Sequence, residues 1–289
     1  MSGSSPKTGE GMKDRKTKKK IREIAWRAAL VVSLCVFVFC AYRLIAIQLE
    51  YKAGTEEYDS LREIAMETTP EATPTPEAEE PEETPQDNTP VEGDEVAAQT
   101  SGDFEAPDIN FDALREINSE VVGWIVMESI DISYPIVKAE DNDKYLGTTF
   151  EGKKNGAGAI FMEHTNQPDF NDCNTLIYGH NMKNGSMFGS LNKILEEAVY
   201  SKSRYFWICT PEGKYRYEIF SAYETPADGE TYTLFSEPGE EFKAYLDAMK
   251  EKSALPQITI PLTGNDKVVT LSTCTANSAN RFVVQGKRV

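Results

Sequence analysis

The pattern of hydrophobic and polar positions divides the chain into three parts. A run without any charge covers residues 28–42, and apolar character continues past Arg43 as far as Ile47. A strongly polar part follows over residues 48–103. Short apolar runs separated by polar turns then fill residues 104–289. We therefore expect three physically different segments rather than one uniform domain.

The first apolar run predicts a transmembrane helix over residues 24–47, preceded by a basic tail over residues 1–23. About 20 helical residues cross a bilayer, and Arg27 and Arg43 would lie near its edges. A cleaved signal peptide is the alternative, with residues 28–42 as its apolar core. No convincing cleavage site follows, so we favour an uncleaved anchor. The basic flank places the N-terminus in the cytoplasm and the rest of the chain outside the cell.

Residues 48–103 predict a spacer. Residues 48–66 are compatible with a short helical stalk. From Glu67 to Asp103 the chain holds six prolines and 12 acidic residues, with no aromatic residue. Such a segment cannot bury enough apolar surface to offset its ordering entropy, and proline and charge repulsion keep it extended. We expect a disordered acidic linker that gives the following domain reach.

Residues 104–289 predict one folded domain of mostly β structure with flanking helices. A short helix is expected near residues 110–118, and longer ones over residues 188–199 and 238–252. The apolar face of the last helix is formed by Phe242, Tyr245, Leu246 and Met249.

Strands are expected in the remaining apolar runs, and two of them flank a turn of the sequence Pro-Glu-Gly-Lys as a hairpin. Many short strands with few helices favour a closed or nearly closed barrel, because closure leaves few exposed edges. The expected strands cover residues 123–127, 130–137, 174–180, 205–209, 215–220, 267–274 and 281–287.

Composition and charge narrow the class of protein. Hydrophobic residues make up 40% of the chain, which excludes a collagen-like repeat and a polytopic membrane protein. The net charge of −17 argues against a general nucleic-acid binder, which needs a basic surface. The charge is uneven: residues 1–62 carry +5, residues 63–103 carry −13 and residues 104–289 carry −9.

Three of the five cysteines follow the predicted membrane segment, which contains Cys35 and Cys40. An odd number cannot form only intrachain pairs. Cys209 lies in the middle of a strand and is expected to be buried. Cys173 lies in a polar loop, where we expect it to be exposed and assign it no role. Cys274 ends the apolar strand VVTLSTC, and a strand end that opens into a loop is a common place for a functional side chain.

A reactive thiol needs a partner, because the thiolate is the nucleophile and an imidazole commonly stabilises it. Only two histidines exist. His180 follows the strand TLIYG, whereas His164 lies in a polar loop with no strand leading into it, so local context favours His180. Arg281 begins the strand after the Cys274 loop, and antiparallel pairing would bring both to one end of the sheet. Arg281 is then a candidate oxyanion donor; the alternative is an ordinary surface arginine.

On these residues the sequence resembles the sortases, and class B sortases in particular. TLSTC at residues 270–274 matches the family's active-site cysteine motif. IYGHNM at residues 177–182 matches the segment that carries the catalytic histidine, and RFVVQGK at residues 281–287 matches the strand that opens with the essential arginine. The order histidine, cysteine, arginine is also the family's order. The similarity covers essentially all of residues 110–289.

The resemblance implies an eight-stranded sortase β-barrel, of mostly β (α+β) class, over residues 104–289. It implies a cysteine transpeptidase with Cys274 as nucleophile, His180 as general acid and base, and Arg281 stabilising the oxyanion. Three neighbours in the same motifs are candidate substrate-binding residues: Ser272, Thr273 and Asn181. No cofactor and no metal ion is expected.

The resemblance also implies the partners. The first substrate would be an exported protein with a C-terminal sorting motif, NPQTN-like or a variant. The second would be an amine, from a peptidoglycan precursor or a pilin lysine. The enzyme would be held at the cell membrane by its N-terminal helix, with no nucleic-acid partner. The sorting motif and the acceptor stay open at this point.

The sequence departs from the class B pattern at two places, and two other classes of protein are alternatives. The loop between Cys274 and Arg281 is short, which we expect to alter the edge of the pocket rather than the chemistry. His164 lies where relatives often carry other residues, and we expect it to be incidental. Another extracellular cysteine enzyme would order its cysteine and histidine differently. A non-enzymatic binding domain would retain its function without the thiol of Cys274.

Overall fold

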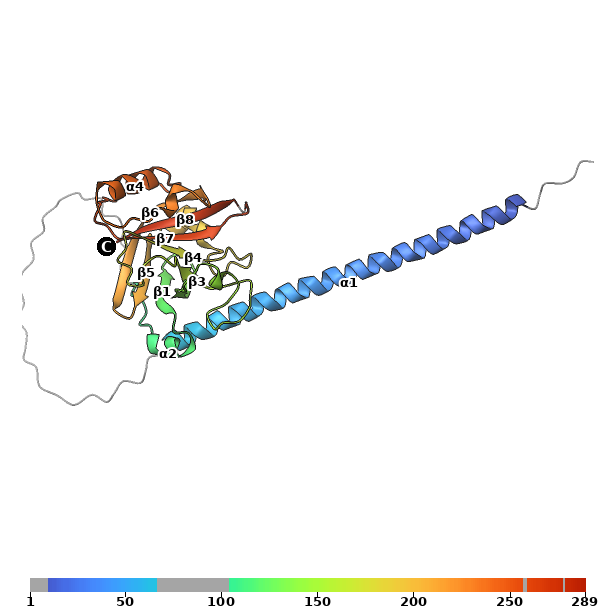
Figure 1. Ribbon diagram of the computed structural model, residues 1–289, viewed down its shortest axis with the longest axis horizontal. Helices are drawn as coiled ribbons and strands as arrows, with labels where there is room; N and C mark the ends of the chain where they lie inside the picture. The colour runs from blue at the N-terminus through green and yellow to red at the C-terminus, as the bar shows by residue number, and fades with distance from the viewer. Residues whose placement is uncertain (1–9, 67–103, 257–258, 278) are drawn as a thin grey trace, which may run out of the picture. The chain divides into compact units, whose positions relative to one another are not determined.

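The computed structural model describes residues 10–66, 104–256, 259–277 and 279–289 (Figure 1). The predicted disordered linker, from Glu67 to Asp103, lies outside these residues, as does the beginning of the basic tail. The chain forms two compact units, Met1–Lys52 and Ala53–Val289, and the second is called the barrel unit below. The second unit therefore begins earlier than the expected domain boundary at residue 104.

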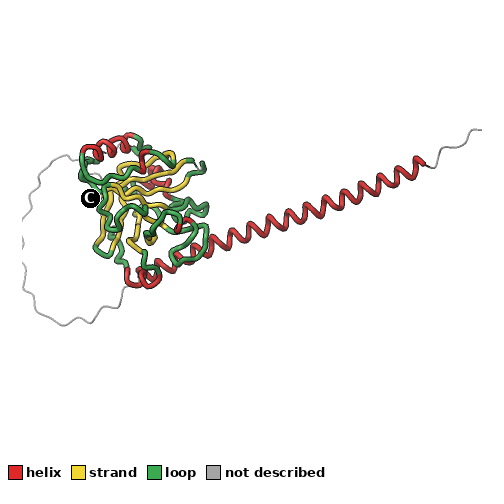
Figure 2. Tube along the Cα trace, viewed as in Figure 1, coloured by secondary structure: helices red, strands yellow, loops and turns green. Residues whose placement is uncertain are grey.

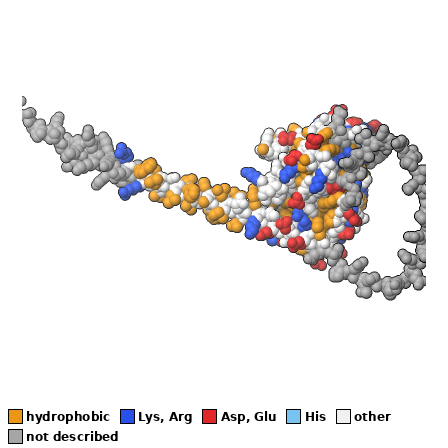
Figure 3. Space-filling view, turned by 180° about the vertical axis from the view of Figure 1, so that it is seen from behind, with side chains coloured by type: hydrophobic (Ala, Val, Ile, Leu, Met, Phe, Trp, Pro, Cys, Tyr) orange, Lys and Arg blue, Asp and Glu red, His pale blue; other side chains and the backbone are white. Residues whose placement is uncertain are grey.

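Helix α1 (Glu10–Met66) is continuous and extends beyond the predicted transmembrane segment at both ends. Within the described residues, it is the one helix that is long and apolar enough to cross a membrane. Figure 3 shows the hydrophobic side chains along it. The large exposed ones include Trp26, Leu30, Val31, Phe37, Phe39, Leu44 and Ile45.

Eight strands close into a barrel in the order β1-β2-β3-β4-β7-β8-β6-β5, with β5 paired to β1, which confirms the predicted fold (Figures 1 and 2). Two neighbouring pairs, β2 with β3 and β4 with β7, are parallel. The strands are β1 (Val121–Met127), β2 (Ile132–Val137), β3 (Ile160–Met162), β4 (Asn174–Tyr178), β5 (Tyr205–Thr210), β6 (Gly213–Pro226), β7 (Val268–Cys274) and β8 (Asn280–Arg288).

Further helices and 3₁₀ turns precede the first strand or lie in the connections between strands. Helix α2 (Phe111–Ile117) precedes β1, and Asn110 caps it by accepting a hydrogen bond from the backbone N–H of Ala113. The others are the 3₁₀ turns η1 (Lys144–Leu146), η2 (Leu191–Leu195) and η3 (Glu230–Tyr232), and the helices α3 (Glu197–Tyr200) and α4 (Glu240–Glu251).

Helix α4 forms where a helix was predicted over residues 238–252, and it packs on the faces of β6, β7 and β8. All four residues of the predicted apolar face are buried. They form one cluster with side chains of the three strands, including Phe220, Val268 and Val283. Burial of these large side chains contributes about 1.5–3 kcal/mol each to the stability of the domain.

The last turns of α1 also pack on the barrel. Tyr58, Leu61 and Ala65 lie on one face at helical spacing, and all three are buried. The Tyr58 hydroxyl donates a hydrogen bond to the carbonyl oxygen of Gly158 at 2.6 Å. Its ring meets the ring of Tyr134 edge-on, with 5.4 Å between centroids. Residues 53–66 are therefore part of the folded domain.

We expect Leu61→Ala to destabilise the barrel unit by about 2–5 kcal/mol, because the side chain is fully buried and its loss leaves a cavity. The measurement is urea unfolding of the full chain in detergent micelles. Glu63→Ala, an exposed position in the same turns of α1, is the control and should change stability by less than about 0.5 kcal/mol. Equal stabilities for the two variants would contradict the packing of residues 53–66.

Three local expectations are wrong. Residues 188–199 do not form one helix, because Glu196 has an extended backbone that separates η2 from α3. A strand does lead into the His164 loop: β3 has only three residues, too few to show a period. Cys173, which was expected to be exposed, is buried: only 3% of it is exposed, because it packs in the cluster beneath α4.

Candidate active site

Cys274 and Arg281 occupy facing positions at the ends of two paired strands. Cys274 is the last residue of β7, and its Cα is the register partner of the Cα of Arg281 at the start of β8. The connecting turn is closed by a hydrogen bond from the Thr275 N–H to the Asn280 carbonyl at 3.3 Å. The expected antiparallel pairing is present, and it fixes the thiol and the guanidinium at one end of the barrel.

His180 lies at the same end of the barrel, just after the neighbouring strand β4. Strands β4 and β7 are parallel, with Tyr178 paired to Ser272 as the last position of the register. The Gly179 N–H then donates to the Ser272 carbonyl at 3.1 Å, which continues the pairing past the end of β4. Since His180 and Cys274 each lie two residues beyond that last pair, the topology brings imidazole and thiol together.

The imidazole of His180 has a defined hydrogen-bond partner. Its Nε2 lies 2.7 Å from the carbonyl oxygen of Leu146, at the end of η1. A carbonyl oxygen only accepts, so Nε2 carries the proton. Gly158 makes room for this arrangement, because a Cβ there would lie 2.4 Å from the Tyr145 carbonyl oxygen and 3.1 Å from Cδ2 of His180. Its φ of +58° also favours glycine.

The side chains of Cys274, His180 and Arg281 line one pocket of about 340 Å³. Its walls come from β3, β4, β7 and β8, from the β2–β3 connection and from the segment after β6. The remaining lining residues are Asn142, Asp143, Leu146, Phe161, Tyr178, Gly179, Ala227, Tyr232, Ser272 and Thr273. A pocket of this size, with mixed apolar and polar walls, suits a few residues of an extended peptide.

Two tyrosines form part of the wall. The rings of Tyr178 and Tyr232 stack with 6.4 Å between centroids. Burial raises the pKa of both hydroxyls, and for Tyr232 it outweighs the hydrogen bond with Ser272 and the positive charge of Arg281, which act to lower the pKa. Both therefore stay neutral at physiological pH. The Tyr232 hydroxyl lies 2.8 Å from Oγ of Ser272, which ties the wall to β7.

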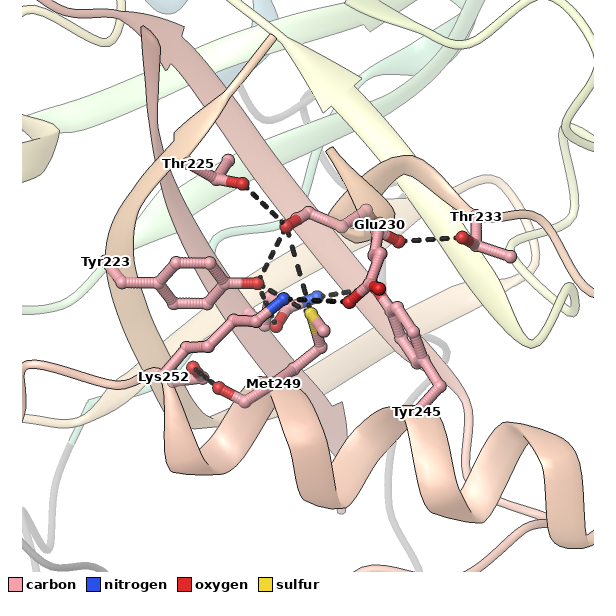
Figure 4. Close-up of polar contacts among 10 residues, drawn as sticks. Tyr223, Thr225, Glu230, Thr233, Tyr245, Met249 and Lys252 are labelled. Atoms are coloured by element: carbon pink, nitrogen blue, oxygen red, sulfur yellow. Dashed lines mark hydrogen bonds and ion pairs between the residues drawn. The ribbon is translucent and has the colours of Figure 1, made fainter. Parts of the chain in front are cut away.

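A buried polar cluster beside α4 holds the segment that carries Tyr232 (Figure 4). The Thr231 hydroxyl donates to Oγ1 of Thr225 at 3.2 Å and lies 2.9 Å from the Tyr223 hydroxyl. The Tyr245 hydroxyl of α4 donates to the Thr231 carbonyl at 2.8 Å. Helix α4 therefore fixes the backbone on one side of Tyr232, and so the position of this part of the pocket wall.

The three candidate substrate-binding residues differ in position. Ser272 and Thr273 line the pocket, although each is at most 3% exposed. Ser272 is engaged with Tyr232, whereas the buried Thr273 hydroxyl has no hydrogen-bond partner among the described residues. Asn181 is not part of the pocket lining; its Nδ2 donates to the carbonyl oxygen of Cys274 at 2.7 Å. The Asn181 side chain therefore contacts the backbone of Cys274 rather than the pocket.

Three pocket residues were not predicted from the sequence: Asn142, Leu146 and Tyr232. They lie in connections far along the chain from the three motifs, and neighbours in sequence give no sign of a pocket wall. Tyr178 is different, because it stands two residues before His180 in the strand already chosen for its histidine.

The other two cysteines of the barrel unit lie outside the pocket. Cys209 is 2% exposed, as predicted, and Cys173 is 3% exposed. Burial raises the pKa of the Cys173 thiol, and it raises that of Cys209 to about 11. A thiol with a raised pKa in an apolar environment is unreactive. Cys274, which is partly exposed in the pocket, is the one of the three that a peptide could reach.

A closed eight-stranded barrel that brings a thiol, an imidazole and a guanidinium to one pocket is the arrangement of a cysteine enzyme. Residues 125–289 match the Sortase domain, and the chain belongs to the sortase family. It is a class B sortase, and thus a cysteine transpeptidase.

The relatives cover most of the folded unit. Sortase B of Listeria monocytogenes is 38% identical over 181 residues, which cover 61% of this chain and 72% of that protein. Sortase B of Staphylococcus aureus is 31% identical over 180 residues, covering 61% and 73%.

Solved structures agree with this assignment. Sortase B of Bacillus anthracis in complex with AAEK1 is 42% identical, covers 62% of this chain and 83% of that chain, and has a TM-score of 0.56. A substrate complex of S. aureus sortase B is 31% identical, covers 62% and 84%, and has a TM-score of 0.58.

Proposed function

We propose that this enzyme cleaves a C-terminal sorting motif of an exported protein and transfers the protein to an amine. The observation that carries the proposal is the convergence of Cys274, His180 and Arg281 on one pocket, from the ends of three adjacent strands. The sulfur of the Cys274 thiolate attacks the carbonyl carbon of a threonine in the motif. The peptide C–N bond then breaks, and a thioester joins the protein to the enzyme.

His180 moves the protons in both half-reactions. With Nε2–H donating to Leu146, Nδ1 is the nitrogen that exchanges a proton with the substrate. It protonates the leaving amine when the thioester forms. It then takes a proton from the incoming amine, which attacks the thioester carbon and releases the thiolate. Atoms and protons balance over the cycle, and no cofactor is required.

Arg281 stabilises the negative oxygen that develops when the thiolate attacks. A guanidinium offers several N–H donors in a fixed plane, so it can bind this oxygen and a neighbouring peptide carbonyl together. Its NH1 donates to the Asn280 carbonyl at 3.0 Å, which orients the group. The register that pairs Arg281 with Cys274 supports this role.

The remaining details are proposed from the family. The sorting motif is NPQTN-like or a variant, and the acceptor is an amine of a peptidoglycan precursor or of a pilin lysine. Residues 24–47 anchor the enzyme in the cell membrane with the N-terminus in the cytoplasm, and residues 104–289 act outside the cell. The exposed apolar side chains of α1 support this anchoring.

The test uses the full chain in detergent micelles with a panel of quenched peptides that carry candidate sorting motifs. We expect one motif to be cleaved, and an amide-linked product to form when an amine acceptor is added. A thioester on Cys274, seen by mass spectrometry of the quenched reaction, would identify the intermediate. Peptide binding without cleavage or thioester for any motif would instead support a non-enzymatic binding domain.

A further inference from the structure

Glu163 is a buried carboxylate beside the pocket that the proposed mechanism does not use. It directly follows β3 and is 8% exposed. Its Oε2 accepts hydrogen bonds from the Tyr178 hydroxyl at 2.9 Å and from Nδ2 of Asn142 at 2.7 Å. Its Oε1 lies 2.6 Å from Nδ1 of His164. Burial of a carboxylate is costly unless the group is hydrogen-bonded, and a fully satisfied buried network also holds its partners rigidly.

The contact with Asn142 fixes the orientation of that side chain. While Nδ2 of Asn142 donates to Glu163, its Oδ1 accepts a hydrogen bond from the His164 backbone N–H at 3.0 Å. Both ends of the amide are therefore held by consecutive residues after β3. Asn142 itself lines the pocket. The clamp joins the β2–β3 connection to the end of β3.

The clamped connection carries the hydrogen-bond partner of the histidine. From Asn142 the chain runs through η1 to Leu146, whose carbonyl oxygen lies 2.7 Å from Nε2 of His180. Leu146 lies only four positions after Asn142 in the chain. A shift of Asn142 would therefore move the group that orients the imidazole.

The contact with Tyr178 fixes the pocket wall. The Tyr178 ring packs against Phe161 with 5.3 Å between centroids and against Tyr232 with 6.4 Å. Its hydroxyl is held by Glu163, so one carboxylate oxygen serves the wall and the Asn142 clamp together.

The carboxylate is charged under working conditions. Burial acts to raise the pKa of Glu163. The hydrogen bonds from Tyr178, Asn142 and the Thr165 N–H, together with the interaction with His164, outweigh it, and the pKa lies below its ordinary value. A charged oxygen accepts such hydrogen bonds more strongly than a neutral one.

We propose that Glu163 is a positioning residue: it holds the 142–146 segment, and through Leu146 the imidazole of His180, while it also holds Tyr178 against the substrate. This inference rests on the proposed function for its kinetic part. The histidine loop and the pocket wall would thus be set by one acid that touches neither the substrate nor the thiol.

The test replaces Glu163 with methionine, which keeps the chain length but removes both acceptor oxygens. Glu163→Gln is the conservative variant, since it keeps one acceptor oxygen. Glu128→Met is the matched control: the Glu128 side chain is 2% exposed and accepts from Ser203 and from Nε1 of Trp207 at 2.8 Å, but it does not line the pocket. All variants are made in the full chain in detergent micelles.

Two readouts separate positioning from stability. The first is the Nε2–H proton of His180 in ¹⁵N-histidine-labelled protein, assigned by its loss in His180→Gln. We expect Glu163→Met to broaden or shift it to the position of a solvent-exposed imidazole, while Glu128→Met leaves it unchanged. The second is peptide cleavage, where Glu163→Met should lower kcat/KM by about 30-fold and Glu163→Gln should recover most of it.

The outcomes distinguish this inference from the proposed function. If wild-type protein cleaves no motif, the proposed function fails, and the proton signal alone decides the role of Glu163. If Glu163→Met keeps the wild-type proton signal, the positioning role is wrong. Equal losses of kcat/KM in Glu163→Met and Glu128→Met would also overturn it, because any buried carboxylate would then have the same effect.

Discussion

Cys274→Ala is expected to abolish peptide cleavage, with a loss of at least about 10³-fold in kcat. The reason is chemical: without the sulfur no thioester forms, and no other side chain of the pocket lining is an activated nucleophile. The measurement is cleavage of the preferred motif by the full chain, together with mass spectrometry of the quenched reaction. Neither product nor acyl-enzyme should be detected.

The chain offers a matched control for this substitution. Cys209→Ala removes another thiol of the barrel unit, one that is buried and whose pKa is raised to about 11 by that burial. It should leave kcat/KM within about twofold of the wild type, since Cys209 does not line the pocket. Cleavage that survives Cys274→Ala at a comparable rate would show that the nucleophile lies elsewhere.

The candidate catalytic residues could be predicted from the sequence, whereas most residues of the pocket walls could not. Cys274 ends an apolar strand, His180 follows one and Arg281 begins one, and strand ends are visible in a hydrophobic pattern. The family resemblance supplied the strand count and the order of the motifs. The pairing of β4 with β7 then brought two of these strand ends together.

The pocket walls could not be predicted in the same way. Leu146 acts through a backbone carbonyl, which any residue could supply, so its side chain gives no signal. Tyr232 follows Thr231 in a polar connection, and its position depends on contacts of that segment with α4. Such positions follow from tertiary packing and are set only when the helix and the strands have assembled.

The same limit explains the error at Cys173. Its sequence neighbours are polar, which predicts a surface loop, but the residues that bury it come from α4 and from β6, β7 and β8.

His164 was expected to be incidental, because its loop gave no sign of function. Its backbone N–H nevertheless donates to Asn142, and its imidazole contacts Glu163, the two residues that hold the 142–146 segment. Sequence neighbours indicate the local structure of a residue, whereas its burial and contacts depend on segments that are distant in sequence.

Arg281→Lys is expected to lower kcat/KM by about 100-fold while the thiol remains reactive. Lysine keeps the positive charge but loses the planar set of donors, so it cannot bind the oxyanion and a peptide carbonyl together. Alkylation of Cys274 by iodoacetamide, which needs no oxyanion donor, should stay within about threefold of the wild-type rate. The two rates are measured on the same preparation of the full chain in detergent micelles.

Arg288→Lys is the matched control, because it makes the same change at the far end of the same strand. The guanidinium of Arg288 stacks on the ring of Tyr215 at 3.5 Å and donates to the side chain of Asn171 at 3.1 Å, and it lies outside the pocket. We expect its kcat/KM to stay within about twofold of the wild type. If Arg281→Lys also stayed within that range, the oxyanion would need another donor, and the pairing of Arg281 with Cys274 would be structural. A large loss confined to Arg281→Lys would instead mean that the β7–β8 register places the guanidinium beside the thiol to stabilise the developing charge.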